Sequence, residues 1–70
     1  MSTHPALTGA KLIKSLARHG FALKRIKGSH HFLQHFDGRC TVVPVHHGET
    51  IGKGLMAKIL RDCELSLDDL

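Results

Sequence analysis

The pair Asp37-Gly38 limits the fold of this chain more than any other feature, because it lies between two short segments with strand character, 30–35 and 40–45. Asp-Gly between two such segments is a strong signal for a β-hairpin. The chain is therefore expected to contain an antiparallel pair of strands with a tight connection.

The length of the connecting loop decides which residues of this hairpin face each other. A three-residue loop, 36–38, with Gly38 in the left-handed conformation, sets residue 33 opposite 41 and residue 31 opposite 43. A two-residue loop sets residue 33 opposite 42 instead and leaves the faces undecided. We expect the first register, with successive side chains on alternating faces. The core side then carries Leu33, Thr41, Val43 and Val45, and the open side carries His30, Phe32 and Gln34.

Two amphipathic helices are predicted on either side of the strands. Thr8 is suited to cap the first helix, residues 8–19, and Gly20 to end it. After a loop at 46–52, apolar residues recur at helical spacing and predict a second helix. These residues are Leu55, Met56, Ile59, Leu60 and Cys63.

The segment 21–26, between the first helix and Gly28, predicts one more strand. The order of elements is then α-β-β-β-α. The most economical packing places both helices on one face of a three-stranded antiparallel sheet, which is an α+β fold.

The length of 70 residues predicts a single domain, residues 1–70, because a chain this short has one small core. Residues 1–7 are expected to form a flexible tail. In 66–70, Ser66 precedes an acid by three residues, which predicts a capped last turn that can fray. The N-terminus lacks the pattern of a secretory signal, and there is no apolar run of about 20 residues, so we expect a cytoplasmic protein.

Charge is distributed unevenly along the chain. Residues 1–39 contain seven Lys and Arg against one acid, whereas residues 40–70 contain three against five. Three of the cations, Lys24, Arg25 and Lys27, directly precede a Gly28-Ser29 turn. Such a cluster favours phosphate as the bound group.

His30 and His31 follow this turn and open the next predicted strand. Because adjacent strand residues point to opposite faces, only one of the two can point toward the core. We expect His31 to be half-buried and to donate to a backbone carbonyl. His30 is then the exposed imidazole among the cations.

The sequence resembles the HicA family of toxins over nearly its whole length, from Leu12 to Leu67. The resemblance rests on motifs that occur in the family's order and spacing. These are Gly-Phe-x-Leu-x-Arg-x-Lys-Gly-Ser-His-His at 20–31, His35-x-Asp37-Gly38-Arg39, Val43-Pro44-Val45-His46, and Gly52-Lys53-Gly54-Leu55 with Ile59-Leu60.

The resemblance implies a double-stranded-RNA-binding-domain-like fold and a metal-independent mRNA interferase that is neutralised by a HicB antitoxin. It also implies that the histidine after Gly-Ser, His30, is the active one. Phe32 would suit either base stacking or a contact with the antitoxin.

A histidine suits RNA cleavage because imidazole has a reference pKa of about 6.5, so a useful fraction is neutral near pH 7. Neutral His30 could take the proton of a ribose 2′-OH. Lys24, Arg25 or Lys27 could stabilise the charge that develops on phosphorus, helped by the Gly28 and Ser29 backbone N–H groups. The general acid stays open between His46, a lysine and water.

The histidines and the order of elements also admit two other interpretations. His31 and His35 have the i, i+4 spacing of a helical zinc site, but on a strand four residues span about 13 Å, so we expect neither a metal nor another cofactor. A non-catalytic RNA-binding module with the same order of elements is the second alternative. A passive binder has no need for an imidazole at residue 30.

Overall fold

The computed structural model describes residues 6–70, so residues 1–5 of the expected tail lie outside it. It confirms the predicted α-β-β-β-α order, with boundaries that differ from prediction by one or two residues at α1, β1 and β3. The elements are α1 (Gly9–Ala17), β1 (Phe21–Lys27), β2 (His30–His35), β3 (Cys40–Pro44), α2 (Lys53–Cys63) and a short 3-10 helix, η1 (Leu67–Asp69).

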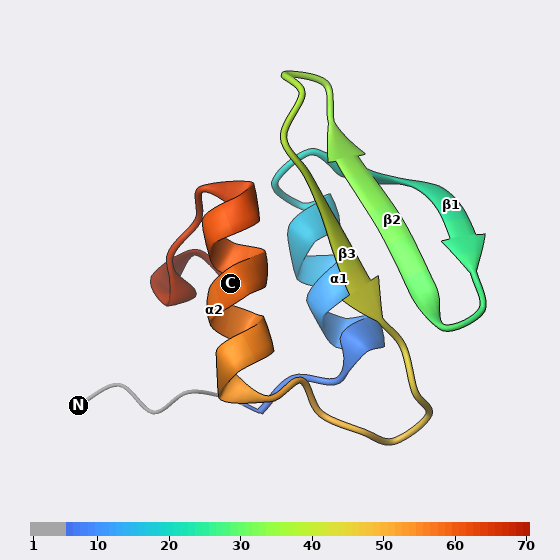
Figure 1. Cartoon of the computed structure of the whole chain (residues 1–70). Coiled ribbons are helices and arrows are strands. Elements are labelled where there is room, and N and C mark those ends of the chain that lie inside the picture. The colour runs from blue at the N-terminus through green and yellow to red at the C-terminus, as the bar shows by residue number, and fades with distance from the viewer. Residues whose placement is uncertain (1–5) are drawn as a thin grey trace.

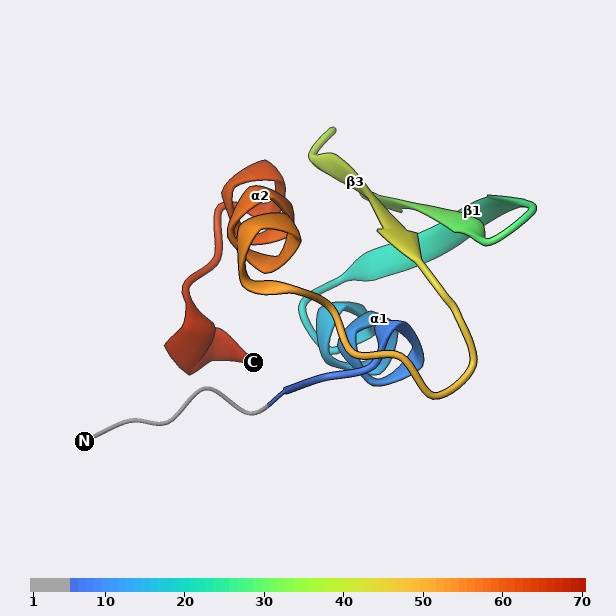
Figure 2. The same ribbon diagram turned by 60° about the horizontal axis from the view of Figure 1, so that its bottom comes forward.

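The three strands form one antiparallel sheet in the order β1-β2-β3, and both helices pack on the same face of it (Figures 1 and 2). We call the face toward the helices the inner face and the opposite one the outer face. Apolar side chains from the inner face and both helices form a single core. Its buried members are Leu12, Leu16, Phe21, Leu33, Val43, Met56, Ile59, Leu60 and Cys63.

The β2–β3 hairpin has the register expected for a three-residue loop. His31 pairs with Val43, and Leu33 pairs with Thr41. Gly38 has a φ of 103°, the left-handed conformation that this loop requires. Leu33, Thr41 and Val43 are buried on the inner face, whereas His30 and Gln34 are exposed and Phe32 is half-buried on the outer face.

Helix α1 begins where the sequence predicts. The Thr8 hydroxyl accepts a hydrogen bond from the Lys11 N–H at 3.2 Å, which satisfies one of the free donors of the first turn. Before it, the Leu7 carbonyl accepts from the Ile51 N–H at 2.7 Å. The chain is therefore tied to the loop before α2 from Leu7 onward.

The C-terminal turn has the predicted cap. The Ser66 N–H and hydroxyl both donate to the Asp69 carboxylate, at 2.8 and 3.1 Å. His19, just after α1, donates from Nε2 to the Asp69 carbonyl oxygen at 2.6 Å. This contact fastens η1 to the end of α1.

Within residues 6–70, no helix has the length and apolar character needed to cross a membrane.

Candidate nucleic-acid interface

His30 is the first residue of β2, and its side chain is exposed. Its two strand partners are Lys27 on β1 and Pro44 on β3. Directly paired residues of an antiparallel sheet share a face, so Lys27 lies beside His30 on the outer face. The imidazole is thus presented to solvent on the side of the sheet that the helices leave open.

The two-residue turn that precedes His30 is held by its backbone. Gly28 has a φ of 61°, and a Cβ added there would meet no atom within 4 Å, so the turn is open to an approaching ligand. The Ser29 carbonyl accepts from the Val45 N–H at 2.8 Å. It also accepts from His31 Nδ1 at 3.1 Å. His31 is half-buried, which confirms its predicted structural role.

Strand β1 contains a β-bulge that the sequence analysis does not predict. Leu23 pairs with Leu33 and Arg25 pairs with Phe32, so Lys24 is the extra residue between them. Arg25 therefore faces outward with Phe32. Lys24 also reaches the outer face, where it lines a groove beside Phe32 and Gln34.

The bulge lets Phe21 face the core while Lys24, in the same strand, faces outward. Counted back from the turn without a bulge, Lys24 would face the helices and Phe21 would face solvent. The extra residue returns Phe21 to the core, where it is 2% exposed, and leaves Lys24 outside. As a result, all three predicted cations, Lys24, Arg25 and Lys27, lie on the face that carries His30.

A signal for this bulge is present in the sequence. The apolar residues Phe21 and Leu23 are two apart, as strand alternation requires, but the next one, Ile26, follows after three. A change of phase within one strand indicates one inserted residue.

His46 lies in the exposed loop after β3. The hydrogen bond from Val45 to Ser29 continues the β2–β3 pairing one residue beyond the strands, which brings the start of this loop to the turn before His30. His46 is thus at the same end of the sheet as His30.

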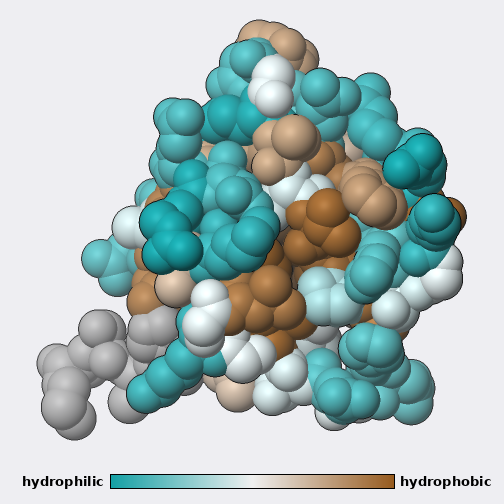
Figure 3. Space-filling model, in the orientation of Figure 1, coloured by the Kyte–Doolittle hydropathy of each residue, from teal (hydrophilic) through white to brown (hydrophobic). Residues whose placement is uncertain are grey.

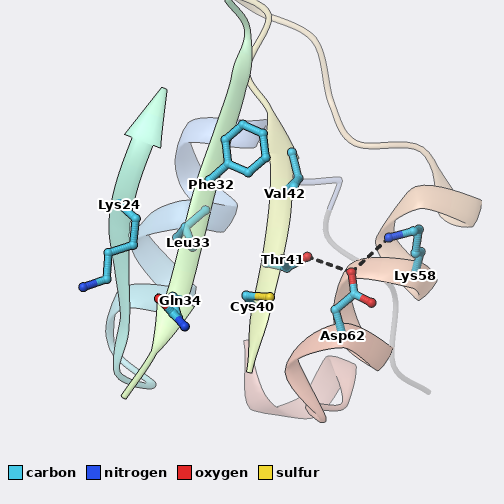
Figure 4. A pocket seen from close by; sticks show the side chains of 9 residues that line it. All are labelled: Lys24, Phe32, Leu33, Gln34, Cys40, Thr41, Val42, Lys58 and Asp62. Carbon is cyan, nitrogen blue, oxygen red and sulfur yellow. Dashed lines mark hydrogen bonds and ion pairs between the residues drawn. The ribbon is translucent and has the colours of Figure 1, made fainter. Parts of the chain in front are cut away.

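A groove of about 400 Å³ lies over the outer side of β2 and β3 and continues past the edge of β3 to α2 (Figure 4). Side chains from all three strands line it, and α2 forms its far rim, where Asp62 binds Thr41 and Lys58. In the space-filling view, apolar surface gathers over β3 and between β3 and α2, with hydrophilic side chains on both sides (Figure 3). The lining residues are Lys24, Phe32, Leu33, Gln34, Cys40, Thr41, Val42, Lys58 and Asp62.

His35 has a different environment from His30. It is 9% exposed and packs edge-on against Phe21, with a distance of 5.2 Å between ring centroids. Its Nδ1 accepts from the Asp37 N–H at 3.2 Å, whereas Nδ1 of His31 binds Ser29.

Within residues 6–70, no three His, Cys, Asp or Glu side chains are arranged to hold a metal ion.

On the hairpin loop, the Asp37 carboxylate is bound by Arg39. The Arg39 N–H donates to its carboxylate at 3.0 Å, and the Arg39 side chain binds both oxygens. These contacts lower the pKa of Asp37 below its usual value, with the backbone hydrogen bond as the largest cause. Arg39 also donates to the Cys63 carbonyl at the end of α2, so the loop is fastened to that helix.

Comparison with protein families gives one match that covers most of the chain. A family model described as the HicA toxin of bacterial toxin-antitoxin matches residues 9–65. The matched range runs from the first residue of α1 to just beyond α2 and includes the whole outer face. None of the curated proteins compared with the chain matches it.

Proposed function

We propose that this chain, which belongs to the HicA family of bacterial toxin-antitoxin toxins, is an mRNA-cleaving endoribonuclease that uses His30 as its base. The observation that carries the proposal is the outer face itself. One exposed imidazole lies there among three cations, on the side of the sheet opposite the helices. This arrangement suits an anionic substrate too large to enter a closed pocket.

The proposed reaction is an internal transfer at phosphorus. Neutral His30 accepts the proton of a ribose 2′-OH, and the 2′-oxygen attacks the adjacent phosphorus. The bond from phosphorus to the 5′-oxygen breaks, and that oxygen takes up a proton. The products are a 2′,3′-cyclic phosphate and a free 5′-OH, and no step requires a metal ion.

The cations are proposed to stabilise the negative charge that develops on the phosphorane. Lys27 is the nearest candidate by register, since it pairs directly with His30. Lys24 and Arg25 extend the positive surface along β1 and are assigned to neighbouring phosphates. The N–H groups of Gly28 and Ser29 are proposed to add hydrogen bonds, because the exposed glycine lets a phosphate approach the backbone.

His46 is our candidate for the general acid, because it lies at the same end of the sheet as His30. A fall in the cleavage rate of His46→Ala with unchanged RNA affinity would support this role. An unchanged rate would assign the proton to a lysine or to water.

Family membership implies an antitoxin partner. We propose that this partner is a HicB-like protein that covers the outer face and blocks His30, and that both act in the cytoplasm on translated mRNA. An acidic surface on the antitoxin would complement the cations of β1. A purified complex in which RNA still reaches His30 would contradict blockade.

The test compares His30→Ala with His47→Ala, an exposed histidine in the loop after β3. We expect His30→Ala to lose growth arrest and RNA cleavage, the latter measured by primer extension on a reporter mRNA and with purified protein in EDTA. His47→Ala should behave as wild type, and circular dichroism should show the same fold for all three proteins.

Two outcomes would overturn the proposal. If His30→Ala kept the toxicity and bound RNA normally, the chain would be the non-catalytic RNA-binding module of the alternative interpretation. If the wild-type protein cut no single-stranded mRNA in EDTA, the metal-independent mechanism would be wrong.

A further inference from the structure

We infer that the groove beside Phe32 is a subsite for one nucleobase of single-stranded RNA, next to the phosphodiester that reaches His30. The inference rests on the proposed function for the identity of the ligand. A base subsite would add recognition of the RNA sequence, which the cations alone do not provide, since phosphate contacts hold RNA without reading its sequence.

The groove has the size and lining of a small-molecule site. Its volume of about 400 Å³ lies within the range of about 300–1,000 Å³ that is typical of ligand pockets. Phe32 and Val42, a directly paired couple, supply apolar wall, and Gln34 and Lys24 supply polar groups. In Figure 4 the ring of Phe32 and the side chain of Gln34 extend from the same side of β2.

The Phe32 ring is held in place before any ligand binds. The Arg25 guanidinium carbon lies 4.7 Å from the centroid of the ring, which is cation–π geometry. Arg25 pairs directly with Phe32 across β1 and β2, so both side chains extend from the outer face and stay in contact. An ordered aromatic ring on an open sheet is the usual platform for an unpaired base.

The position of the groove relative to His30 fits successive nucleotides. Phe32 lies two residues after His30 on the same face of β2, a displacement of about 7 Å at about 3.4 Å per residue. A base on Phe32 therefore belongs to a nucleotide adjacent to the cleaved bond. A base inside a duplex is stacked and paired on both sides, so the occupant must be single-stranded.

The charge around the groove favours RNA over an apolar peptide. Lys24 forms one end of it and Lys58 lies on the opposite rim, where Asp62 partly neutralises its charge. The Gln34 amide offers both a donor and acceptors to a base edge. A cationic border, an aromatic wall and a two-way hydrogen-bonding side chain together match a base attached to its phosphates.

The test measures RNA affinity in the His30→Ala background, where no cleavage can occur. Two short single-stranded RNAs are compared by fluorescence anisotropy, one intact and one with a single abasic ribose beside the expected cleavage site. Each is bound to proteins that carry Phe32, Phe32→Leu or Phe32→Tyr. Phe36→Leu is the matched control, because Phe36 is 94% exposed on the hairpin loop and does not line the groove.

We expect Phe32→Leu to weaken binding of the intact RNA about tenfold, as loss of one base–aromatic contact does. Phe32→Tyr and Phe36→Leu should bind nearly as the parent does. The abasic RNA should bind weakly to the parent. Phe32→Leu should weaken binding of the abasic RNA little further, because the missing base has already removed the contact that the Phe32 ring makes. Additive losses, or equal effects of Phe32→Leu and Phe36→Leu, would overturn the subsite.

Cleavage by the otherwise wild-type protein separates this inference from the proposed function. If Phe32→Leu still cuts but at altered positions and with a raised KM, both hold. If it cuts at unchanged positions with an unchanged KM, the subsite is wrong and the nuclease stands. If the wild-type protein does not cut, the binding experiment still decides the subsite. A loss confined to antitoxin binding would assign Phe32 to the protein partner and overturn the inference.

Discussion

Gly20 shows how a single residue controls the passage from α1 to β1. It has a φ of 90°, and a Cβ added there would lie 2.7 Å from His35 Nε2. Its backbone therefore needs the left-handed region, and its missing side chain leaves room for the buried imidazole. The His35 ring in turn packs against Phe21, the one buried residue of β1.

We predict that Gly20→Ala destabilises the protein by about 1–3 kcal/mol, because of backbone strain and the contact with the His35 ring. Gly54→Ala is the matched control, since Gly54 is an exposed helical residue with nothing within 4 Å of an added Cβ. That variant should gain about 0.4–1 kcal/mol. Chemical denaturation measures both, and equal stabilities would contradict the role of Gly20.

At this scale, strand alternation predicts the faces of His30 and His31 correctly and puts His35 on the core face with Leu33, but it does not predict how closely His35 is packed. Adjacent strand residues must alternate, so one exposed and one half-buried histidine follow directly from the pattern. The burial of His35 depends on Phe21 and Gly20, which come from a segment that is distant in sequence. Contacts of this kind require the packed structure.

At the scale of an element, the register of β1 is harder to predict from the sequence than the register of the β2–β3 hairpin. The loop 36–38 predicts the β2–β3 register because its length admits few geometries. No such constraint exists within β1, where simple alternation misplaces every residue before Arg25. Only the break in apolar spacing between Leu23 and Ile26 marks the bulge.

The cations on β1 predict a measurable dependence of RNA binding on salt. Neutralising one phosphate contact, as in Lys27→Gln, should reduce the slope of log K against log salt by about 0.7 for a single strand. Lys14→Gln, on the exposed side of α1, should leave the slope unchanged. Titrations in the His30→Ala background measure this, and equal slopes for both variants would remove Lys27 from the interface.

The cap of η1 predicts how stability changes in acid. The hydrogen bonds from Ser66, its backbone N–H first, lower the pKa of Asp69 from its usual value of 3.8. A carboxyl whose pKa is lowered in the folded state stabilises the protein above its unfolded pKa, and the contribution is lost as pH falls through the folded one.

Asp69→Asn should therefore lower the melting temperature at neutral pH, and the difference from wild type should begin to shrink as pH falls to about 3.8 and vanish below the lowered pKa of the folded state. Asp68→Asn makes the same change of charge without touching the cap. A matching decrease in that variant would show that net charge, and not the cap, is responsible.

At the scale of the whole molecule, the two cysteines lie in opposite environments, Cys40 on the outer face of the sheet and Cys63 in the core. Their small apolar side chains predict partial burial for both, but Cys40 is exposed beside the outer groove and Cys63 is fully buried in the core. Burial is the largest cause that raises the pKa of the Cys63 thiol to about 11. The native thiol is therefore protonated and sheltered at neutral pH.

Iodoacetamide should accordingly alkylate Cys40 in the native protein and leave Cys63 unmodified until the core opens. Mass spectrometry of peptides after timed exposure measures both sites, and the same reaction in guanidinium chloride is the control in which both react. Comparable rates at the two cysteines under native conditions would contradict a closed core.

The composition of β1 has a consequence for the solution behaviour of the protein. Within residues 6–70 this strand pairs only with β2, so its other side is a free sheet edge, and its inward Leu23 and Ile26 are 47% and 55% exposed. Such an edge invites pairing between copies, and lysines and bulges are the usual protection against it. The residues proposed to hold RNA thus also oppose aggregation, so replacing all of them with neutral residues would reduce solubility together with affinity.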